Sequence, residues 1–256
     1  MFILELCYLI PAHSSCTDNE AAHALHSLLA SWRMNGQIIG TEHGIARADS
    51  SYTISVICPE ATALHEEWDN KYVRAAKAEI QRLELLAQPI RSIGYDIEAM
   101  TLCCCQTISS FILMTHYLSM ESPVRCGDCF CPIPLYRLPK TYDDEYYNII
   151  VWQSDYQACD RLFMNSRVLE RATNRELSRF HSKLSQDGYA LCRQLEKLTG
   201  IPVYYSIKTH YGRSQQQEQQ RQCPACGGPW LLEEAWHAFD FKCESCRLLS
   251  NIAYSI

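Results

Sequence analysis

The stretch CPACGGPWLLEEAWHAFDFKCESC, Cys223 to Cys246, decides the fold of the C-terminal segment. It holds two Cys-x-x-Cys pairs that are separated by sixteen residues. A Cys-x-x-Cys turn aims two thiolates at one ion, and two such turns supply the four sulfur ligands of a closed tetrahedral zinc site. We therefore expect a zinc ribbon with one structural Zn²⁺, bound by Cys223, Cys226, Cys243 and Cys246.

The residues around these cysteines agree with a structural site. Gly227 and Gly228 permit the positive φ that such a turn needs. The segment is too short for an adequate apolar core, so we expect a bound metal ion to supply the missing stability. An unmetallated thiol cluster and a redox dithiol are the alternatives. The ribbon also contains aromatic residues that form either its core, which we favour, or platforms for stacked bases: Trp230, Trp236, Phe239 and Phe241.

The first third of the chain alternates strand-like and helix-like patterns. Residues 2–10 read as a strand, and residues 17–34 read as a helix capped by Thr17 or Asp18. Two strands are expected within residues 37–60, a helix within 66–87 and a last strand within 101–120. The order strand, helix, strand, strand, helix, strand predicts a ferredoxin-like α/β sandwich.

The middle of the chain has a different pattern. Residues 121–141 contain four prolines and three cysteines, which indicates a boundary or long loop, and residues 143–200 are helical in pattern. Residues 201–211 read as a strand, and a polar linker follows. We expect an α+β protein in three segments: an α/β sandwich domain over 1–120, a Cys/Pro-rich loop and helical region over 121–212, and the linker and zinc ribbon over 213–256.

A second group of cysteines leaves three interpretations open. Cys126 and Cys129 are half of a second zinc site, a redox pair, or a turn with packed thiols, which is the reading we favour. A metal site here requires completion by residues of Cys103–Cys105 or by a histidine. On a strand those three cysteines alternate between faces, so at most two of them can converge.

The composition and the absence of certain motifs limit the classes of protein to which this sequence can belong. Fifteen cysteines without an export signal predict a reducing compartment, and we expect a cytoplasmic protein. No apolar run reaches the length of a membrane span. The sequence has no Gly-rich phosphate loop, nucleophile elbow or paired carboxylate motif. We therefore expect no catalytic residues, no enzyme activity and no small-molecule substrate.

One basic pattern favours an anionic partner. Basic residues recur every four positions and are expected to form a ridge on one helix: Arg167, Arg171, Arg175, Arg179 and Lys183. Glu170 and Glu176 lie among them, so an ordinary solvated face is the favoured alternative. Thr173 also begins a capping-box pattern, and a helix that starts there would split the ridge.

Several stretches together resemble a known family. They are RCGDCFCPIPLYRLP, WQSDYQACDRLFM, LCRQLEKLTGIPVYY and the two halves of the ribbon. The sequence is similar to an uncharacterised bacterial family described as Zn-ribbon-containing and possibly nucleic-acid-binding. The resemblance implies a zinc ribbon on the four C-terminal cysteines and no established activity.

Charge separates two hypotheses on function. Residues 1–120 carry seven Lys and Arg against thirteen Asp and Glu, which suits a basic protein partner. We favour a non-catalytic protein-binding module, for example an immunity protein that neutralises a toxin. The alternative is nucleic-acid binding through the ridge and the ribbon. The acidic ribbon makes it less favourable, because phosphate neutralisation dominates nucleic-acid affinity.

Overall fold

Two units, each built around its own β-sheet, make up the protein, which is described by a computed structural model over residues 1–41, 43–212 and 214–255. Unit 1 comprises Met1–Leu102, Met120–Ser122 and Pro134–Tyr147. Unit 2 comprises Cys103–Ser119, Pro123–Ile133 and Asn148–Ile256. The chain crosses between the units more than once, so these units differ from the three expected segments. Residues 213 and 256, which bound the expected ribbon segment, lie outside the described residues.

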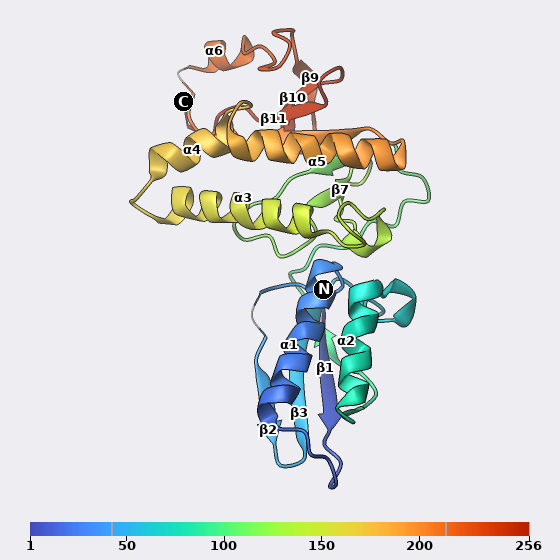
Figure 1. Ribbon diagram of the computed structural model, residues 1–256. Helices are drawn as coiled ribbons and strands as arrows, with labels where there is room; N and C mark the ends of the chain where they lie inside the picture. Colours follow the sequence, from blue (N-terminus) through green and yellow to red (C-terminus); the bar gives the residue numbers. More distant parts are fainter. Residues whose placement is uncertain (42, 213, 256) are drawn as a thin grey trace. The chain divides into compact units, whose positions relative to one another are not determined.

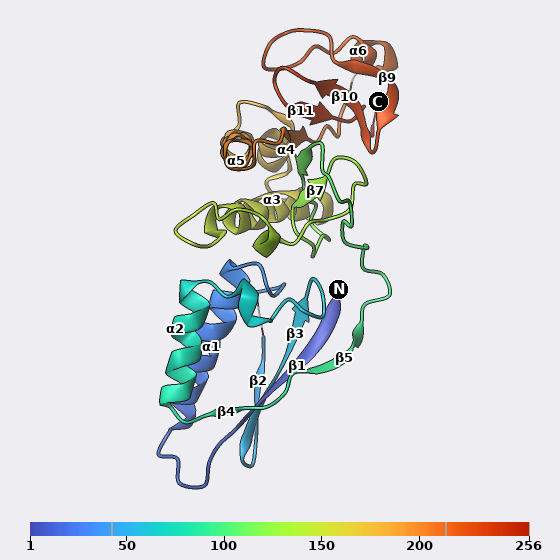
Figure 2. The ribbon, with the colours of Figure 1, turned by 90° about the vertical axis from the view of Figure 1, so that its right-hand side faces the viewer.

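Unit 1 contains an antiparallel sheet with the order β2-β3-β1-β4, in which β5 also pairs with β1. Its strands are β1 (Phe2–Leu9), β2 (Ile45–Ala48), β3 (Ser51–Cys58), β4 (Leu86–Ala87) and β5 (Arg91–Tyr95). Its helices are α1 (Asp18–Met34) and α2 (Lys71–Arg82), with the 3-10 turns η1 (Glu66–Trp68) and η2 (Leu135–Arg137). Both α-helices lie on one face of the sheet (Figure 1 and Figure 2).

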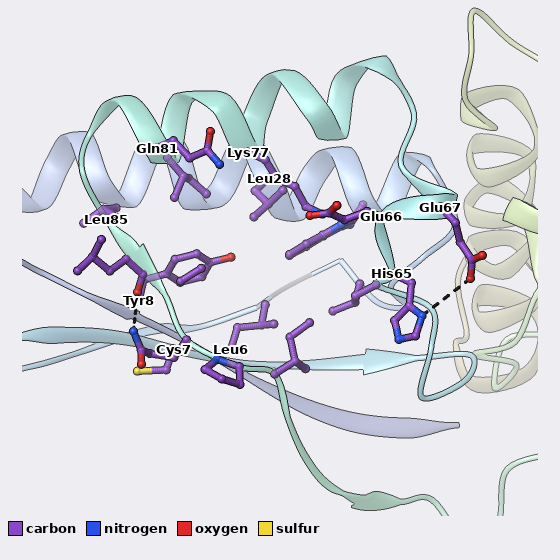
Figure 3. Close-up of a pocket in the computed structure, with 18 residues that line it drawn as sticks. Leu6, Cys7, Tyr8, Leu28, His65, Glu66, Glu67, Lys77, Gln81 and Leu85 are labelled. Atoms are coloured by element: carbon purple, nitrogen blue, oxygen red, sulfur yellow. Dashed lines mark hydrogen bonds and ion pairs between the residues drawn. The ribbon is translucent and has the colours of Figure 1, made fainter.

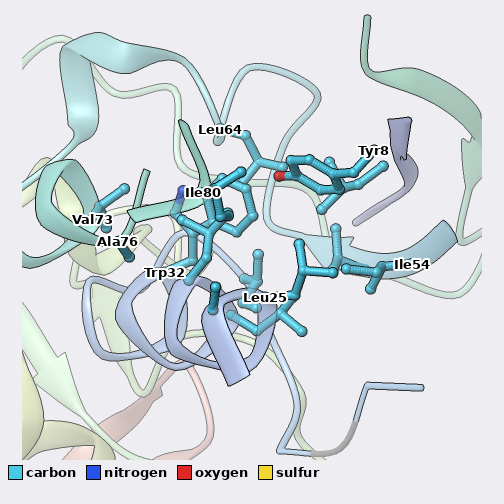
Figure 4. Packing of buried hydrophobic residues seen from close by; sticks show 14 of the residues in the cluster. Tyr8, Leu25, Trp32, Ile54, Leu64, Val73, Ala76 and Ile80 are labelled. Atoms are coloured by element: carbon cyan, nitrogen blue, oxygen red, sulfur yellow. The ribbon is translucent and has the colours of Figure 1, made fainter. Parts of the chain in front are cut away.

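The start of α1 follows from local sequence chemistry. Thr17 is the N-cap, and its side chain accepts a hydrogen bond from the N–H of Glu20. The Glu20 carboxylate in turn accepts from the N–H of Thr17 at 2.9 Å, which completes a capping box. The apolar face of α1 then packs on the sheet and on α2 (Figure 4), in a core that includes Tyr8, Leu25, Trp32, Ile54 and Ile80.

The last strand of unit 1 does not lie where the sequence pattern placed it. Residues 101–120 contribute β6 (Phe111–Leu113), which belongs to the sheet of unit 2. The strands that complete unit 1 are β4 and β5, which lie beside β1. Nearly all of their residues are exposed, so they lack the alternation of buried and exposed positions by which a strand is predicted.

Unit 2 contains a mixed sheet with the order β7-β6-β8-β11-β10-β9. Beside β6, its strands are β7 (Val124–Cys126), β8 (Val203–Ile207), β9 (Leu231–Trp236), β10 (Phe239–Cys243) and β11 (Leu248–Ser250). Its helices are α3 (Tyr147–Asn165), α4 (Glu170–Ser178), α5 (Lys183–Thr199) and α6 (Gln215–Gln219). The expected strand in residues 201–211 is confirmed as β8.

The ribbon is part of this larger sheet. Strand β11 pairs in parallel with β8, so that Leu248 lies opposite Tyr205, and β9 and β10 extend the sheet outward from β11. Trp230, Phe239 and Phe241 are buried in this arrangement, as the favoured core interpretation requires. The C-terminal cysteines are therefore held by the core of unit 2 as well as by their own turns.

A substitution at Gly188 of α5 tests how closely this helix packs in unit 2. A Cβ atom there would overlap the rings of Tyr205 and Trp152. An exposed Gly→Ala change inside a helix normally stabilises by about 1 kcal/mol. At this position we expect Gly188→Ala to destabilise the protein by about 1–3 kcal/mol, because the added methyl overpacks the core. Chemical denaturation measures the change.

Gly94→Ala is the matched control, because no heavy atom lies within 4 Å of a Cβ built at Gly94. It should leave the free energy of unfolding close to that of the wild type. Equal stability of Gly188→Ala and the wild type would contradict the close contact of α5 with β8 and α3.

Candidate metal centres

The four ribbon cysteines converge as the sequence predicts. The Sγ atoms of Cys223, Cys226, Cys243 and Cys246 all lie within 4.8 Å of one another. Cys226 Sγ is 3.8 Å from Cys243 Sγ. A tetrahedron with metal–sulfur bonds of about 2.3 Å has edges of about 3.8 Å, so the donor set fits one tetrahedral ion. This group could therefore hold a metal ion.

Backbone hydrogen bonds shape the first turn of this group. The N–H of Gly227 donates to the carbonyl of Cys223 at 2.8 Å, and the N–H of Cys223 donates to the carbonyl of Gly228 at 2.9 Å. Gly227 has a φ of +70°, which glycine adopts without strain. The N–H of Gly228 also donates to the Cys226 thiol and is the main reason that its pKa falls to about 7. Burial raises the pKa of Cys223 to about 12.

A second group of four cysteines lies in unit 2. The Sγ atoms of Cys103, Cys105, Cys126 and Cys129 all lie within 4.8 Å of one another. The sequence favoured a turn with packed thiols at Cys126 and Cys129 and left open a metal site completed by residues of Cys103–Cys105. The structure brings Cys103 and Cys105 to them, which is the grouping that this alternative requires. Residues 103–105 belong to no helix or strand, and Cys104, the second of the three cysteines, is not a member of this group. This group also could hold a metal ion.

Sequence reasoning left open whether two of the cysteines at 103–105 or a histidine would complete this group. Cys103 and Cys105 have the spacing Cys-x-Cys within a run of three cysteines, and they lie more than twenty residues before Cys126. The available signal was the expected alternation of the three cysteines, by which at most two of them can converge. What was missing was the fold of the loop, in which the N–H of Cys103 donates to the carbonyl of Pro132 at 3.0 Å.

The five basic residues of the expected ridge do not share one helix. Helix α4 ends at Ser178, with Arg179 as its C-cap, and Lys183 begins α5. Arg167 precedes α4. Thr173 does not cap a new helix, because α4 already begins at Glu170 and the Thr173 hydroxyl donates to the carbonyl of Leu169.

The bend between α4 and α5 nevertheless gathers part of the ridge. A cavity of about 540 Å³ is lined by Arg175, Arg179 and Lys183, together with His181 and with Pro224 of the first ribbon turn. Arg167 and Arg171 are not among its lining residues. Three of the five basic residues, with one acidic residue, Glu176, therefore line a cationic cavity next to the ribbon, where the sequence predicted an extended ridge.

Unit 1 has a larger cavity of about 910 Å³ on the helical side of its sheet (Figure 3). Leu6, Tyr8 and Leu28 contribute apolar walls, and His65 and Lys77 contribute polar groups. Burial raises the pKa of Tyr8 to about 12, so its phenol is neutral at physiological pH. The cavity is therefore mainly an apolar recess.

Unit 1 also presents an exposed apolar strip, which we define as residues 86–100. Ile97 is 85% exposed and Tyr95 is 68% exposed. The large hydrophobic residues exposed in this strip are Leu86, Ile90, Ile93, Tyr95, Ile97 and Met100.

Within the part of the chain that the structure describes, no helix combines the length and apolarity that a membrane span requires.

Metal removal should act on unit 2 alone. We expect a strong chelator at pH 7 to speed amide hydrogen exchange in β9 and β10 by more than about tenfold, or about 1.4 kcal/mol. The reason is that metal-binding free energy is part of the folding free energy of a small metal-bound segment. Helices α1 and α2 are the internal control, because both cysteine groups lie in unit 2. Unchanged exchange in β9 and β10 would contradict a metal-stabilised ribbon.

Comparisons with known proteins place the chain in a family without an assigned activity. Three family models, each described as a domain of unknown function, match residues 1–94 (DUF8589), 105–208 (DUF2310) and 212–256 (DUF8594). A solved structure titled "putative antibiotic biosynthesis monooxygenase" from Deinococcus radiodurans covers 40% of this chain and 99% of its own, at 17% identity and a TM-score of 0.25. At that score the likeness supports no conclusion about this protein.

Two relatives come from Haemophilus influenzae, and both are described as uncharacterized proteins. One is 42% identical over 145 residues, which cover 56% of this chain and 71% of the relative. The other is 34% identical over 260 residues, which cover 100% of this chain and 99% of the relative. The chain therefore belongs to the same family as this uncharacterised Haemophilus influenzae protein, which it matches from end to end.

Proposed function

We propose that the protein is a non-catalytic binding protein whose partner is another protein, and that the apolar strip of unit 1 is the contact surface. The strip is the single observation that carries this proposal. Large apolar side chains that gather in one exposed segment are typical of protein–protein contact sites, whereas scattered ones are ordinary on any surface. Here they occupy two strands and the segment that follows.

The backbone pairing and the acidic neighbours of the strip favour a folded partner whose contact surface has basic residues at its rim. Strand β5 is paired with β1, which gives its side chains a defined backbone to project from. Asp96 and Glu98 flank the exposed Ile97. A partner with an apolar centre and basic residues around it would complement this surface. A toxin neutralised by an immunity protein is one example of such a partner.

The framework of this proposal is a ferredoxin-like unit 1. Its helix and strand order, with β1 between β3 and β4 in an antiparallel sheet, supports that assignment. The helices cover one face of the sheet and leave the edge strand β5 accessible.

The C-terminal metal is proposed to be a structural zinc ion. Four cysteine thiolates in a tetrahedron are the donor set of closed structural zinc sites, which leave no open position for catalysis. Such a site needs reduced thiols, so a reducing compartment such as the cytoplasm is part of the proposal. Zinc would thus stabilise the ribbon rather than perform a reaction.

Photo-crosslinking tests the partner and its contact site together. A photo-reactive amino acid at position 97 should crosslink one protein in stoichiometric yield, and nuclease treatment should not remove the adduct. The same amino acid at position 78 is the matched control, because Ala78 is exposed on α2 of the same unit. Equal adducts at both positions, or none at position 97, would rule out the strip as the contact surface.

Charged substitutions measure the contribution of the strip. Ile93→Asp with Ile97→Asp should weaken binding of the crosslinked partner by more than about tenfold, because each places an unpaired carboxylate in an apolar contact. Both side chains are already exposed, so stability should change little. Isothermal calorimetry measures the affinity, and Ala78→Asp is the control.

Nucleic-acid binding is a second candidate, which the cationic cavity favours. Its three basic side chains could bind phosphate groups of a single strand. The burial of Trp230, Phe239 and Phe241 weighs against it, since buried rings are not available for base stacking.

Arginine variants separate the two candidates. If nucleic acid is the partner, Arg175→Ala with Arg179→Ala should reduce oligonucleotide affinity and flatten its salt dependence. Arg167→Ala with Arg171→Ala removes the same charge outside the cavity and is the control. Equal effects of the two double variants would indicate nonspecific attraction.

A further inference from the structure

The turn at Cys126–Cys129 repeats the geometry of the first ribbon turn. The N–H of Phe130 donates to the carbonyl of Cys126 at 2.9 Å, and the N–H of Cys126 donates to the carbonyl of Cys131 at 3.0 Å. The equivalent two bonds close the turn at Cys223. The N–H of Asp128 also donates to Cys126 Sγ at 3.4 Å, as the N–H of Ala225 does to Cys223 Sγ. The backbone is therefore arranged around the sulfur atoms in the same way in both turns.

A left-handed residue follows the second cysteine in each Cys-x-x-Cys turn. The φ angles are +70° at Gly227, +53° at Arg247 and +62° at Phe130. A positive φ is uncommon and costly for a residue with a bulky side chain. This shared left-handed position gives the Cys126–Cys129 turn the same backbone form as the two ribbon turns.

The other two cysteines come from a segment that is tied to this turn. Besides the Cys103–Pro132 bond, the Ser109 N–H donates to the Asp128 carboxylate at 2.8 Å. Asp128 lies between the two cysteines of the turn, so both strands of chain are fixed relative to each other. Cys104 and Cys131 lie nearby and are not members of the four-sulfur group.

We propose that Cys103, Cys105, Cys126 and Cys129 bind a second structural zinc ion. Four thiolates in a tetrahedral arrangement are typical of zinc or of iron–sulfur centres. The repeat of the ribbon turn favours a single ion of the kind proposed for the ribbon site, so the identity of the ion rests on that proposal. Each thiol loses its proton on binding, and the ion joins the segment before β6 to the end of β7.

The second zinc site also supports the ribbon. Phe130 stacks on His237 in the turn between β9 and β10, with ring centroids 4.8 Å apart, and it packs edge-on against Phe239. His237 Nε2 hydrogen-bonds to the carbonyl of Gly127 at 2.6 Å. The ion that holds the second turn therefore positions the residues that contact the ribbon hairpin. This site does not depend on the identity of the partner proposed above.

Metal content of the full chain tests the second site. We expect two zinc ions per chain by mass spectrometry of the native protein and by elemental analysis. Cys129→Ser and Cys105→Ser should each leave one zinc ion, and so should Cys226→Ser at the ribbon. Cys104→Ser and Cys131→Ser are the matched controls and should retain two. One zinc ion in the wild type, two in Cys129→Ser, or iron in place of zinc would overturn the proposal.

Thiol labelling of the wild type covers the case in which a variant fails to fold. Cys104 and Cys129 are both accessible to solvent. With zinc bound, a thiol-alkylating reagent should label Cys104 at least about tenfold faster than Cys129, because coordination removes the free thiolate. After chelation Cys129 should be labelled at least as fast as Cys104. Equal labelling of Cys104 and Cys129 before chelation would refute coordination by Cys129.

Discussion

Unit 2 depends on the pairing of one strand, β8, on both of its edges. All five of its residues are buried, so its backbone N–H and C=O groups need partners within the protein. Strand β6 supplies them on one side and β11 on the other, both in parallel. This is the reason that a cysteine turn in the middle of the chain and the ribbon at its end belong to one sheet. The helices α3 and α5 then pack against β8 through Trp152 and Gly188.

The two cysteine groups lie at solvent-exposed turns of this sheet, beyond its buried strands. Strands β6, β7 and β11 have three residues each, and the turns after β7 and β10 are open to solvent. Exposed turns bury too little surface to offset the entropy of ordering them. In the proposed assignment, zinc ions supply the missing stabilisation at both places. Phe130 and His237 join the two places, so the ribbon is braced by its neighbour as well as by its own ligands.

Much of the local structure was predictable, and the exceptions share a physical cause. The helix cap at Thr17, strand β8 and the convergence of the four ribbon cysteines follow from short-range patterns and are confirmed. Strands β4 and β5 were missed because edge strands with exposed side chains carry no alternating pattern. The prediction that the five basic residues share a single helix was wrong, because α4 ends before Arg179 and the chain turns there.

The sequence by itself determined the grouping of the four ribbon cysteines, the capping of α1 and the acidic balance of residues 1–120. These depend on residue type and on spacings of a few positions, which set turn geometry and charge directly. Only the tertiary structure decided that Cys103 and Cys105 join Cys126 and Cys129, and that Arg175, Arg179 and Lys183 line one cavity beside Pro224. Those groupings bring together residues far apart in the chain or across a bend, and their proximity is set by strand pairing and helix packing rather than by local spacing.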